Sequence, residues 1–233
     1  MGGKKLVSKR TAAKGVGVRT GLIFDLDGTL VDSLPGIAAS LNRSLASLGL
    51  PSHPHSAVRS FIGDGAKMLV RRALGGNASA EVEAEVITLF ASDYGMKWAE
   101  GTTVFPGVSE LLEELRMRGS RLAVLSNKPH QFTTEIVTQL FPAGTFQAVL
   151  GHRDGLLHKP DPQGAIEITR ALGIGPAQCV IIGDSTIDLE TATGAGMKSI
   201  GVTWGYHDKS CLTAANYLID EVSQLSDLLR TFN

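Results

Sequence analysis

The sequence is poor in cysteine, in aromatic side chains and in long apolar runs. Two of its 233 residues are cysteines and aromatic residues make up 6%. Apolar runs stay well short of the roughly 20 residues that a membrane-spanning helix needs, and none resembles the continuous apolar stretch of a secretory signal. Cys179 stands in the apolar run Cys179–Ile182, which favours a buried free thiol over a disulfide or a metal ligand. These absences predict a soluble cytoplasmic protein with no membrane partner.

A large excess of charge of one sign is missing too, since the formal net charge is −1. Six of the 22 basic residues nevertheless fall in the first 20 residues, which contain no acid, and the rest of the chain carries 16 basic against 23 acidic side chains. We interpret residues 1–20 as a solvated, flexible basic leader rather than a nucleic-acid or targeting arm, because glycines interrupt any helical periodicity. The acidic remainder predicts no nucleic-acid partner.

Short apolar runs bounded by turn residues recur along the chain, and helical spacing separates the later ones. Strands alternating with helices predict parallel β-α-β units, hence an α/β fold with a doubly wound, Rossmann-like parallel sheet. The predicted strands lie near residues 22–24, 122–125, 148–150, 180–182 and 199–202, and the helices near 108–118, 130–140, 162–172 and 187–196.

Residues 34–104 break this alternation. Three segments there have helical spacing, at 34–48, 65–74 and 80–98, and no strong strand lies between them. The sequence therefore predicts a helical insertion, residues 34–104, after the first strand, with residues 21–33 and 105–233 forming the α/β core.

Two acids follow the first predicted strand directly, in the run Phe24-Asp25-Leu26-Asp27-Gly28-Thr29. A carboxylate at the carboxyl end of a buried strand faces the crevice in which such sheets bind ligands. The different environments of two neighbouring carboxylates can shift their pKa values apart. One then stays ionised as a nucleophile or metal ligand while the other carries a proton. Taken alone, the pattern also fits an acidic turn that caps a helix.

Polar groups follow the later strands as well. Ser126 and Asn127 end the second predicted strand, where a hydroxyl and backbone N–H groups can hold phosphate oxygens. Lys159 stands just before Pro160 and Pro162, and a lysine fixed in such a loop can offset the charge of phosphate and nucleophile. Each pattern alone also fits a turn or a solvated loop.

Asp184 and Asp188 follow the apolar run Val180–Ile182. One or two carboxylates together with phosphate oxygens are enough to bind Mg²⁺, which keeps several of its waters. A helix N-cap at Asp184 or Ser185 is the simpler alternative.

Together, the four patterns resemble the signatures of the haloacid dehalogenase superfamily in order, spacing and placement after strands. They are Asp25-x-Asp27-Gly-Thr29, Ser126-Asn127, Lys159-Pro160 and Gly183-Asp184-Ser185-x-x-Asp188. The resemblance spans residues 22 to about 205. It implies a Mg²⁺-dependent phosphomonoester hydrolase that works through an aspartyl-phosphate.

The resemblance also implies a role for each matched residue. Asp25 is the expected nucleophile, Asp27 the general acid and base, and Lys159 the residue that orients nucleophile and phosphate. Thr29, Ser126 and Asn127 are expected to bind phosphate. The expected metal ligands are Asp25, Asp27 through its backbone carbonyl, and Asp184, with Asp188 nearby as a ligand through water or as a hydrogen-bond partner.

The inserted residues 34–104 resemble the helical cap of this superfamily, which implies that residues 21–33 and 105–233 are its catalytic core. Within the cap, Arg59-Ser60-Phe61-Ile62-Gly63-Asp64-Gly65 resembles the phosphoglycolate phosphatase branch. The resemblance implies that Gly63, Gly65 and Arg59 contact a small phosphorylated metabolite such as 2-phosphoglycolate. Arg71 and Arg72 are further candidates for binding its carboxylate. Asp64 opposes this interpretation, because an acid in the loop repels a carboxylate. A helix-helix turn with solvated arginines is the structural alternative.

Alternative functions stay open at this stage. A β-phosphoglucomutase-like phosphotransferase, a sugar phosphatase or a pyrophosphatase shares every core residue, and a non-catalytic regulatory protein on the same scaffold is less favoured, because all core residues are present. Sequence alone leaves the oligomeric state open.

Overall fold

The structure is a computed structural model that describes residues 20–232. The interpretation of the basic leader falls on residues that lie, except for Thr20, outside this range. Within the described range, each helix is too short or too polar to span a bilayer.

Six strands form a fully parallel sheet, as the alternation of apolar runs and helices predicted. The strand order is β5-β4-β1-β6-β7-β8, so β1 lies at the centre between β4 and β6. The strands are β1 Gly21–Phe24, β4 Arg121–Pro129, β5 Ala148–His152, β6 Cys179–Gly183, β7 Lys198–Val202 and the short edge strand β8 Tyr217–Ile219, which the sequence analysis did not predict.

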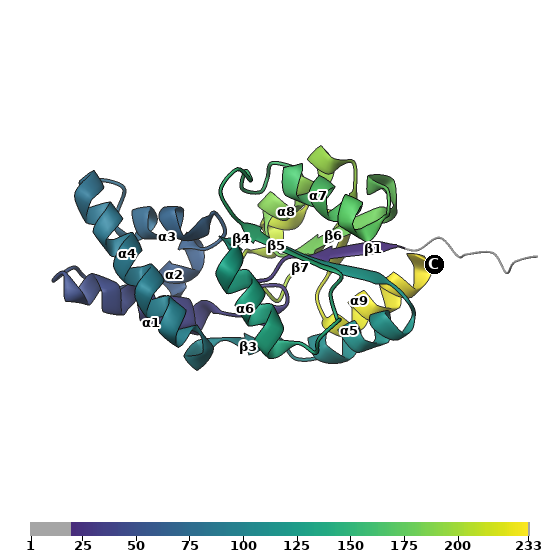
Figure 1. Cartoon of the computed structure of the whole chain (residues 1–233), viewed down its shortest axis with the longest axis horizontal. Coiled ribbons are helices and arrows are strands. Elements are labelled where there is room, and N and C mark those ends of the chain that lie inside the picture. The colour runs from purple at the N-terminus through teal and green to yellow at the C-terminus, as the bar shows by residue number, and fades with distance from the viewer. Residues whose placement is uncertain (1–19, 233) are drawn as a thin grey trace, which may run out of the picture.

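Helices cover both faces of the sheet (Figure 1). They are α5 Val108–Met117, α6 His130–Leu140, α7 Gln163–Leu172, α8 Thr186–Ala195 and α9 Val222–Leu229. Side chains alternate along β1, so Leu22 and Phe24 join a core with α5, α6 and α9, whereas Ile23 joins a second core with α7 and α8. Burial on both faces explains why the strands read as continuous apolar runs.

The other helices gather at one end of the molecule, beyond the carboxyl end of β1 (Figure 1). They are α1 Leu34–Ser47, α2 His55–Phe61, α3 Gly65–Ala73 and α4 Ala80–Lys97. The seven-residue α2 was not predicted, because Pro51 and Pro54 precede it and the segment is short. That these helices act as a separate cap with the predicted boundaries stays a prediction.

A short ribbon carries the chain into and out of this helical region. Strand β2, Val31–Asp32, pairs antiparallel with β3, Thr103–Val104. The sequence analysis missed both strands, because two-residue strands leave no periodic signal.

Candidate active site

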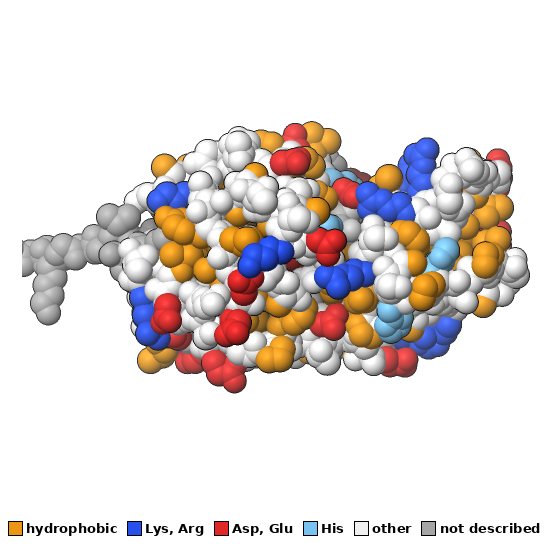
Figure 2. All heavy atoms as spheres, turned by 180° about the vertical axis from the view of Figure 1, so that it is seen from behind, with side chains coloured by type: hydrophobic (Ala, Val, Ile, Leu, Met, Phe, Trp, Pro, Cys, Tyr) orange, Lys and Arg blue, Asp and Glu red, His pale blue; other side chains and the backbone are white. Residues whose placement is uncertain are grey.

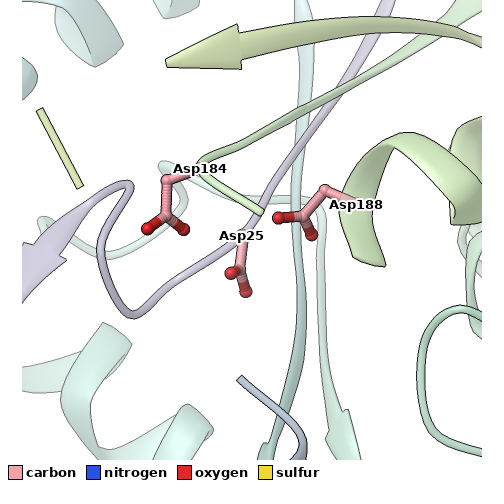
Figure 3. Close-up of side chains that lie close together, drawn as sticks. All are labelled: Asp25, Asp184 and Asp188. Carbon is pink, nitrogen blue, oxygen red and sulfur yellow. The ribbon is translucent and has the colours of Figure 1, made fainter. Parts of the chain in front are cut away.

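Three carboxylates converge at the carboxyl ends of the central strands. Asp25 follows β1, Asp184 follows β6, and Asp188 projects from the first turn of α8 (Figure 3). One oxygen from each lies within 4.8 Å of the others. Asp184 and Asp188 are buried, with 2% and 0% exposure, and Asp25 is partly buried. This cluster of hard oxygen donors is able to bind a metal ion.

Lys159 provides the cation nearest to this cluster. Its Nζ atom lies 2.9 Å from Asp25 Oδ1 and 2.6 Å from Asp188 Oδ1. The backbone of Lys159, which precedes Pro160 through a cis peptide bond, is held by the side chain of Asn127, which accepts from Lys159 N at 2.7 Å and donates to Lys159 O at 3.0 Å. The loop lysine is thus fixed in place and buried.

Burial and neighbouring charges together set the pKa values of Asp25 and Lys159. Burial raises the pKa of Asp25, Lys159 acts to lower it, and the charges of Asp188 and Asp184 raise it further. Burial acts to lower the pKa of Lys159, but the charges of Asp188 and Asp25 outweigh it, so the net pKa is raised. One lysine therefore does not offset three carboxylates, and an added divalent cation would stabilise the ionised form of Asp25.

The turn after β1 places Asp27 beside the cluster. Its Oδ1 accepts from Ser33 Oγ at 2.5 Å, and both of its oxygens accept from Lys128 Nζ, at 2.9 and 2.8 Å. Gly28, with φ +82°, turns the chain sharply. A β-carbon at Gly28 would collide with the Asp184 carboxylate, so the close approach of this turn to β6 requires glycine.

Helix α8 begins with a reciprocal cap that orients Asp188. Ser185 Oγ donates to Asp188 Oδ2 at 2.7 Å, while the backbone N–H of Asp188 donates back to Ser185 Oγ. The sequence analysis weighed an N-cap against a metal site at this position. The structure shows a cap formed by Ser185 and Asp188, and Asp188 Oδ1 still reaches Lys159.

A cleft of about 800 Å³, counting the space at its open mouth, lies between these strand ends and the helical region. Eight predicted site residues line it: Asp25, Asp27, Gly63, Gly65, Ser126, Asn127, Lys159 and Asp184. The opposite wall is mainly apolar and comes from α1, α3, α4 and the loop before α3: Ile37, Ile62, Ala66, Leu69, Phe90, Ala91 and Tyr94.

The glycine loop of the helical region touches the strand ends directly. Asn127 Nδ2 donates to Gly63 O at 3.0 Å. Gly65, with φ +83°, packs so closely on His158 and on the Asn127 carbonyl that a β-carbon there would collide. The structure therefore brings the Gly63 and Gly65 backbone to the cleft, and their contact with a substrate there stays a prediction.

Three predicted site residues are absent from the cleft lining: Thr29, Arg59 and Asp188, which belongs to the carboxylate cluster. Thr29 is buried, and its hydroxyl has no hydrogen-bond partner among the described residues. Arg59 donates from Nε to Tyr206 O at 2.5 Å and from Nη2 to Gly205 O at 3.0 Å. Its guanidinium thus fastens α2 to the loop after β7, and substrate binding by Thr29 and Arg59 stays a prediction.

The cleft lining also includes Lys128, Tyr206 and His207, which the sequence analysis did not predict as site residues. The loop after β7 contacts the strand ends directly, because Tyr206 N donates to Asp184 Oδ2 at 2.6 Å, and Tyr206 Oη accepts from Ser33 N at 2.7 Å. His207 lies 3.4 Å from Asp184, and its pKa is raised by that hydrogen bond.

The pattern of the haloacid dehalogenase-like hydrolases matches residues 22–202 of the chain. A phosphoglycolate phosphatase of Pseudomonas putida is 38% identical over 191 residues, which cover 80% of this chain and 70% of the relative. Another, from Psychrobacter arcticus, is 35% identical over 217 residues, covering 89% and 94%.

Solved structures show the same fold. The crystal structure of a predicted phosphoglycolate phosphatase from Haemophilus somnus superposes with a TM-score of 0.85 at 29% identity, covering 94% of this chain and 100% of that one. A predicted phosphatase from Clostridium acetobutylicum gives a TM-score of 0.82 at 28% identity, with 91% and 99% covered.

Proposed function

The chain belongs to the haloacid dehalogenase-like hydrolase family and is a phosphatase that acts on a small metabolite; from this premise we propose that Asp25 is its nucleophile. One observation carries the proposal: a partly buried carboxylate at the end of the central strand lies 2.9 Å from the ammonium of Lys159 and beside a second acid, Asp27. This is the arrangement that covalent catalysis by a carboxylate needs.

The reaction has two steps. An oxygen of Asp25 forms a bond to phosphorus while the bond from phosphorus to the leaving alkoxide breaks, and Asp27 gives its proton to that alkoxide. Asp27 then takes a proton from water, whose oxygen attacks the aspartyl-phosphate and releases inorganic phosphate and free Asp25. Lys159 orients Asp25 throughout, and Ser126 and Asn127 offer hydrogen bonds at the phosphate end of the cleft.

The residues present fit Mg²⁺, which takes hard oxygen ligands and keeps several waters. We propose that Asp25 and Asp184 hold it through their carboxylates and Asp27 through its backbone carbonyl. Both oxygens of Asp188 already bond within the chain, to Lys159 and Ser185, which favours a position for Asp188 outside direct ligation. When bound, Mg²⁺ supplies positive charge that offsets the repulsion between Asp25 and the phosphate.

We propose 2-phosphoglycolate as the leading substrate. The relatives from Pseudomonas putida and Psychrobacter arcticus carry the name phosphoglycolate phosphatase. The glycine loop packs against the strand ends at Gly63 and Gly65, which favours a small leaving group over a bulky one. Cys179 and Cys211 are both free thiols, which supports our further proposal of a cytoplasmic location.

The deciding experiment is a comparison of kcat/KM for 2-phosphoglycolate, sugar phosphates, nucleotides and pyrophosphate at saturating Mg²⁺. We expect 2-phosphoglycolate to give the highest value. If another compound exceeds it by more than about tenfold, roughly 1.4 kcal/mol of transition-state discrimination, the substrate assignment is wrong. Phosphate transferred to an added sugar instead of to water would indicate the phosphotransferase alternative.

A further inference from the structure

A carboxylate on the leaving group needs a cationic partner, and the arginines that the sequence suggested are engaged elsewhere. Arg59 binds the Gly205 and Tyr206 carbonyls. Arg72 donates to Phe61 O and pairs with Asp64. Arg71 borders a separate shallow groove together with Arg72. None of the three is among the described residues that line the cleft.

Three side chains that line the cleft can carry positive charge: Lys128, Lys159 and His207. Lys159 is bound to the Asp25 and Asp188 carboxylates. His207 lies against Asp184, at the metal side of the cleft. Lys128 is the remaining cation, and its partner is Asp27, the acid that faces the leaving oxygen in the proposed reaction.

The position of Lys128 suits recognition of the leaving group. It stands near the carboxyl end of β4, and its side chain is 7% exposed. Its Nζ atom is 2.8 and 2.9 Å from the two oxygens of Asp27 and 4.9 Å from the centre of the Tyr94 ring. Because Asp27 faces the leaving oxygen in the proposed reaction, an ammonium that touches Asp27 would lie near the first substituents beyond that oxygen.

Tyr94 offers a second donor at this place. The residue is 2% exposed and lines the cleft, and its hydroxyl lies near Lys128 and Thr102 without completing a well-formed hydrogen bond among the described residues. A buried hydroxyl without a partner costs free energy, which a bound anion would recover.

The apolar wall of the cleft makes a single cation important for binding a carboxylate. Ile62, Leu69 and Phe90 form the apolar wall that faces these groups, and an unpaired carboxylate is strongly disfavoured against such a wall. On the face seen in Figure 2, basic and acidic side chains are mixed, with no broad field of one sign that would select an anionic substrate from outside. This face therefore offers no charged field of its own, and the cations inside the cleft are the candidates for discrimination by charge.

We propose that Lys128 is the specificity-determining residue that selects phosphomonoesters whose leaving alcohol carries a carboxylate. In the free enzyme its ammonium is bound to Asp27, and with substrate it donates to the carboxylate of the leaving group as well, assisted by the Tyr94 hydroxyl. A neutral leaving group gains no such contact. This inference rests on the proposed function, since it assumes hydrolysis at Asp25 with Asp27 facing the leaving oxygen.

The test is Lys128→Met, assayed at saturating Mg²⁺ with 2-phosphoglycolate and with 2-hydroxyethyl phosphate, which replaces the carboxylate by a neutral hydroxymethyl group. We expect the wild type to prefer 2-phosphoglycolate and the variant to lose at least about tenfold of that preference in the ratio of the two kcat/KM values. Lys128→Arg, which keeps the charge, should retain part of it.

Lys67→Met is the matched control, because Lys67 is an exposed lysine of α3 that does not line the cleft. It should leave the ratio unchanged. If Lys128→Met slows both substrates equally, Lys128 merely orients Asp27 and the inference is wrong. A wild type without preference for the carboxylate also overturns it. Failure of the proposed function would look different, since the wild type would then hydrolyse neither phosphomonoester.

A variant too slow to assay can be judged by binding. With Mg²⁺ present, 3-phosphonopropionate and 3-hydroxypropylphosphonate form the corresponding non-hydrolysable pair, and calorimetry measures their affinities. We expect Lys128→Met to weaken binding of the carboxylate compound at least about tenfold more than that of the neutral one. Equal weakening overturns the inference. Circular dichroism establishes that the variant is folded.

Discussion

The two walls of the cleft differ in almost every physical respect. One wall, which we call the floor, consists of charged and polar groups at the ends of β1, β4 and β6 and in the loops beside them: Asp25, Asp27, Lys128, Lys159 and Asp184. The other, the roof, comes from the helical region and is mainly apolar: Ile37, Ile62, Ala66, Leu69 and Phe90.

Each ionisable group of the floor has a partner of opposite charge or a hydrogen bond within the chain. The roof, apart from the Tyr94 hydroxyl and the backbone of the glycine loop, contributes apolar surface that sets the shape of the cleft. Changes to Asp25, Lys159 or Asp184 should therefore act on the rate of reaction with every substrate, whereas changes to Lys128 or to the roof should act on the choice between substrates.

The largest effect is expected at the nucleophile. Asp25→Asn should lower kcat by at least about 10⁴-fold, because the amide keeps the shape of the side chain but cannot attack phosphorus as an anion. Steady-state assays measure the loss, and circular dichroism should show an unchanged fold. Asp220→Asn is the control, since Asp220 is an exposed acid paired with Lys209 and should leave activity intact. Near wild-type turnover by Asp25→Asn would refute the covalent mechanism.

Removal of the metal should abolish the activity that depends on the charged groups of the floor. Chelation is expected to abolish turnover, and added Mg²⁺ to restore it, because Asp25 and the phosphate repel each other without a cation between them. Ca²⁺ should restore activity poorly, since it tolerates more ligands and looser geometry than the octahedral site of Mg²⁺. Full activity in excess chelator would rule out Asp25 and Asp184 as functional ligands.

Asp27→Asn should have a smaller effect that depends on the leaving group. A general acid contributes about 10²–10⁴-fold, so hydrolysis of 2-hydroxyethyl phosphate should slow by that amount. The loss in kcat/KM, which reports on transfer of the phosphoryl group to Asp25, should be much smaller for p-nitrophenyl phosphate, whose leaving group departs without a proton. Equal losses of kcat/KM with both substrates would exclude proton transfer to the leaving oxygen by Asp27.

The smallest effect on rate is expected at the roof. Leu69→Ala removes side-chain volume from the apolar wall and so enlarges the cleft. It should raise kcat/KM for bulkier phosphomonoesters relative to 2-phosphoglycolate by less than about tenfold. Stability should fall by about 2–5 kcal/mol, as for other buried leucines. Leu172→Ala, in the core on the opposite face of the sheet, should lose similar stability without changing selectivity. A shift of selectivity in both variants would mean that lower stability, and not the roof, causes it.

The sheet and the floor carboxylates were predictable because their signals are local. Apolar runs such as Leu22–Phe24 predict buried strands, and β1 forms there as Gly21–Phe24. Acids placed directly after such runs, as Asp25 and Asp184 are, must meet at one edge of a parallel sheet. The structure brings both into one cluster with Asp188.

Lys128 and Tyr206 could not be predicted in the same way. The apolar run ends at Leu125, so the sequence suggests that the strand ends there, whereas β4 continues to Pro129 and carries Lys128 into the cleft. Tyr206 reaches Ser33 across 173 positions of sequence. Such contacts depend on how the loops fold over the sheet, and no periodicity encodes them.

The ribbon of β2 and β3 has a consequence for how this architecture can vary. Val31 pairs with Val104 and Asp32 with Thr103, so the two ends of the inserted helical segment lie side by side, within about 6 Å as in any antiparallel pair. An insert whose ends already meet adds little to the closure cost, since doubling the length of a flexible loop costs only about 0.6 kcal/mol. We therefore expect the loops of the segment between Asp32 and Thr103 that lie away from the cleft to tolerate changes of length at little cost in closure entropy.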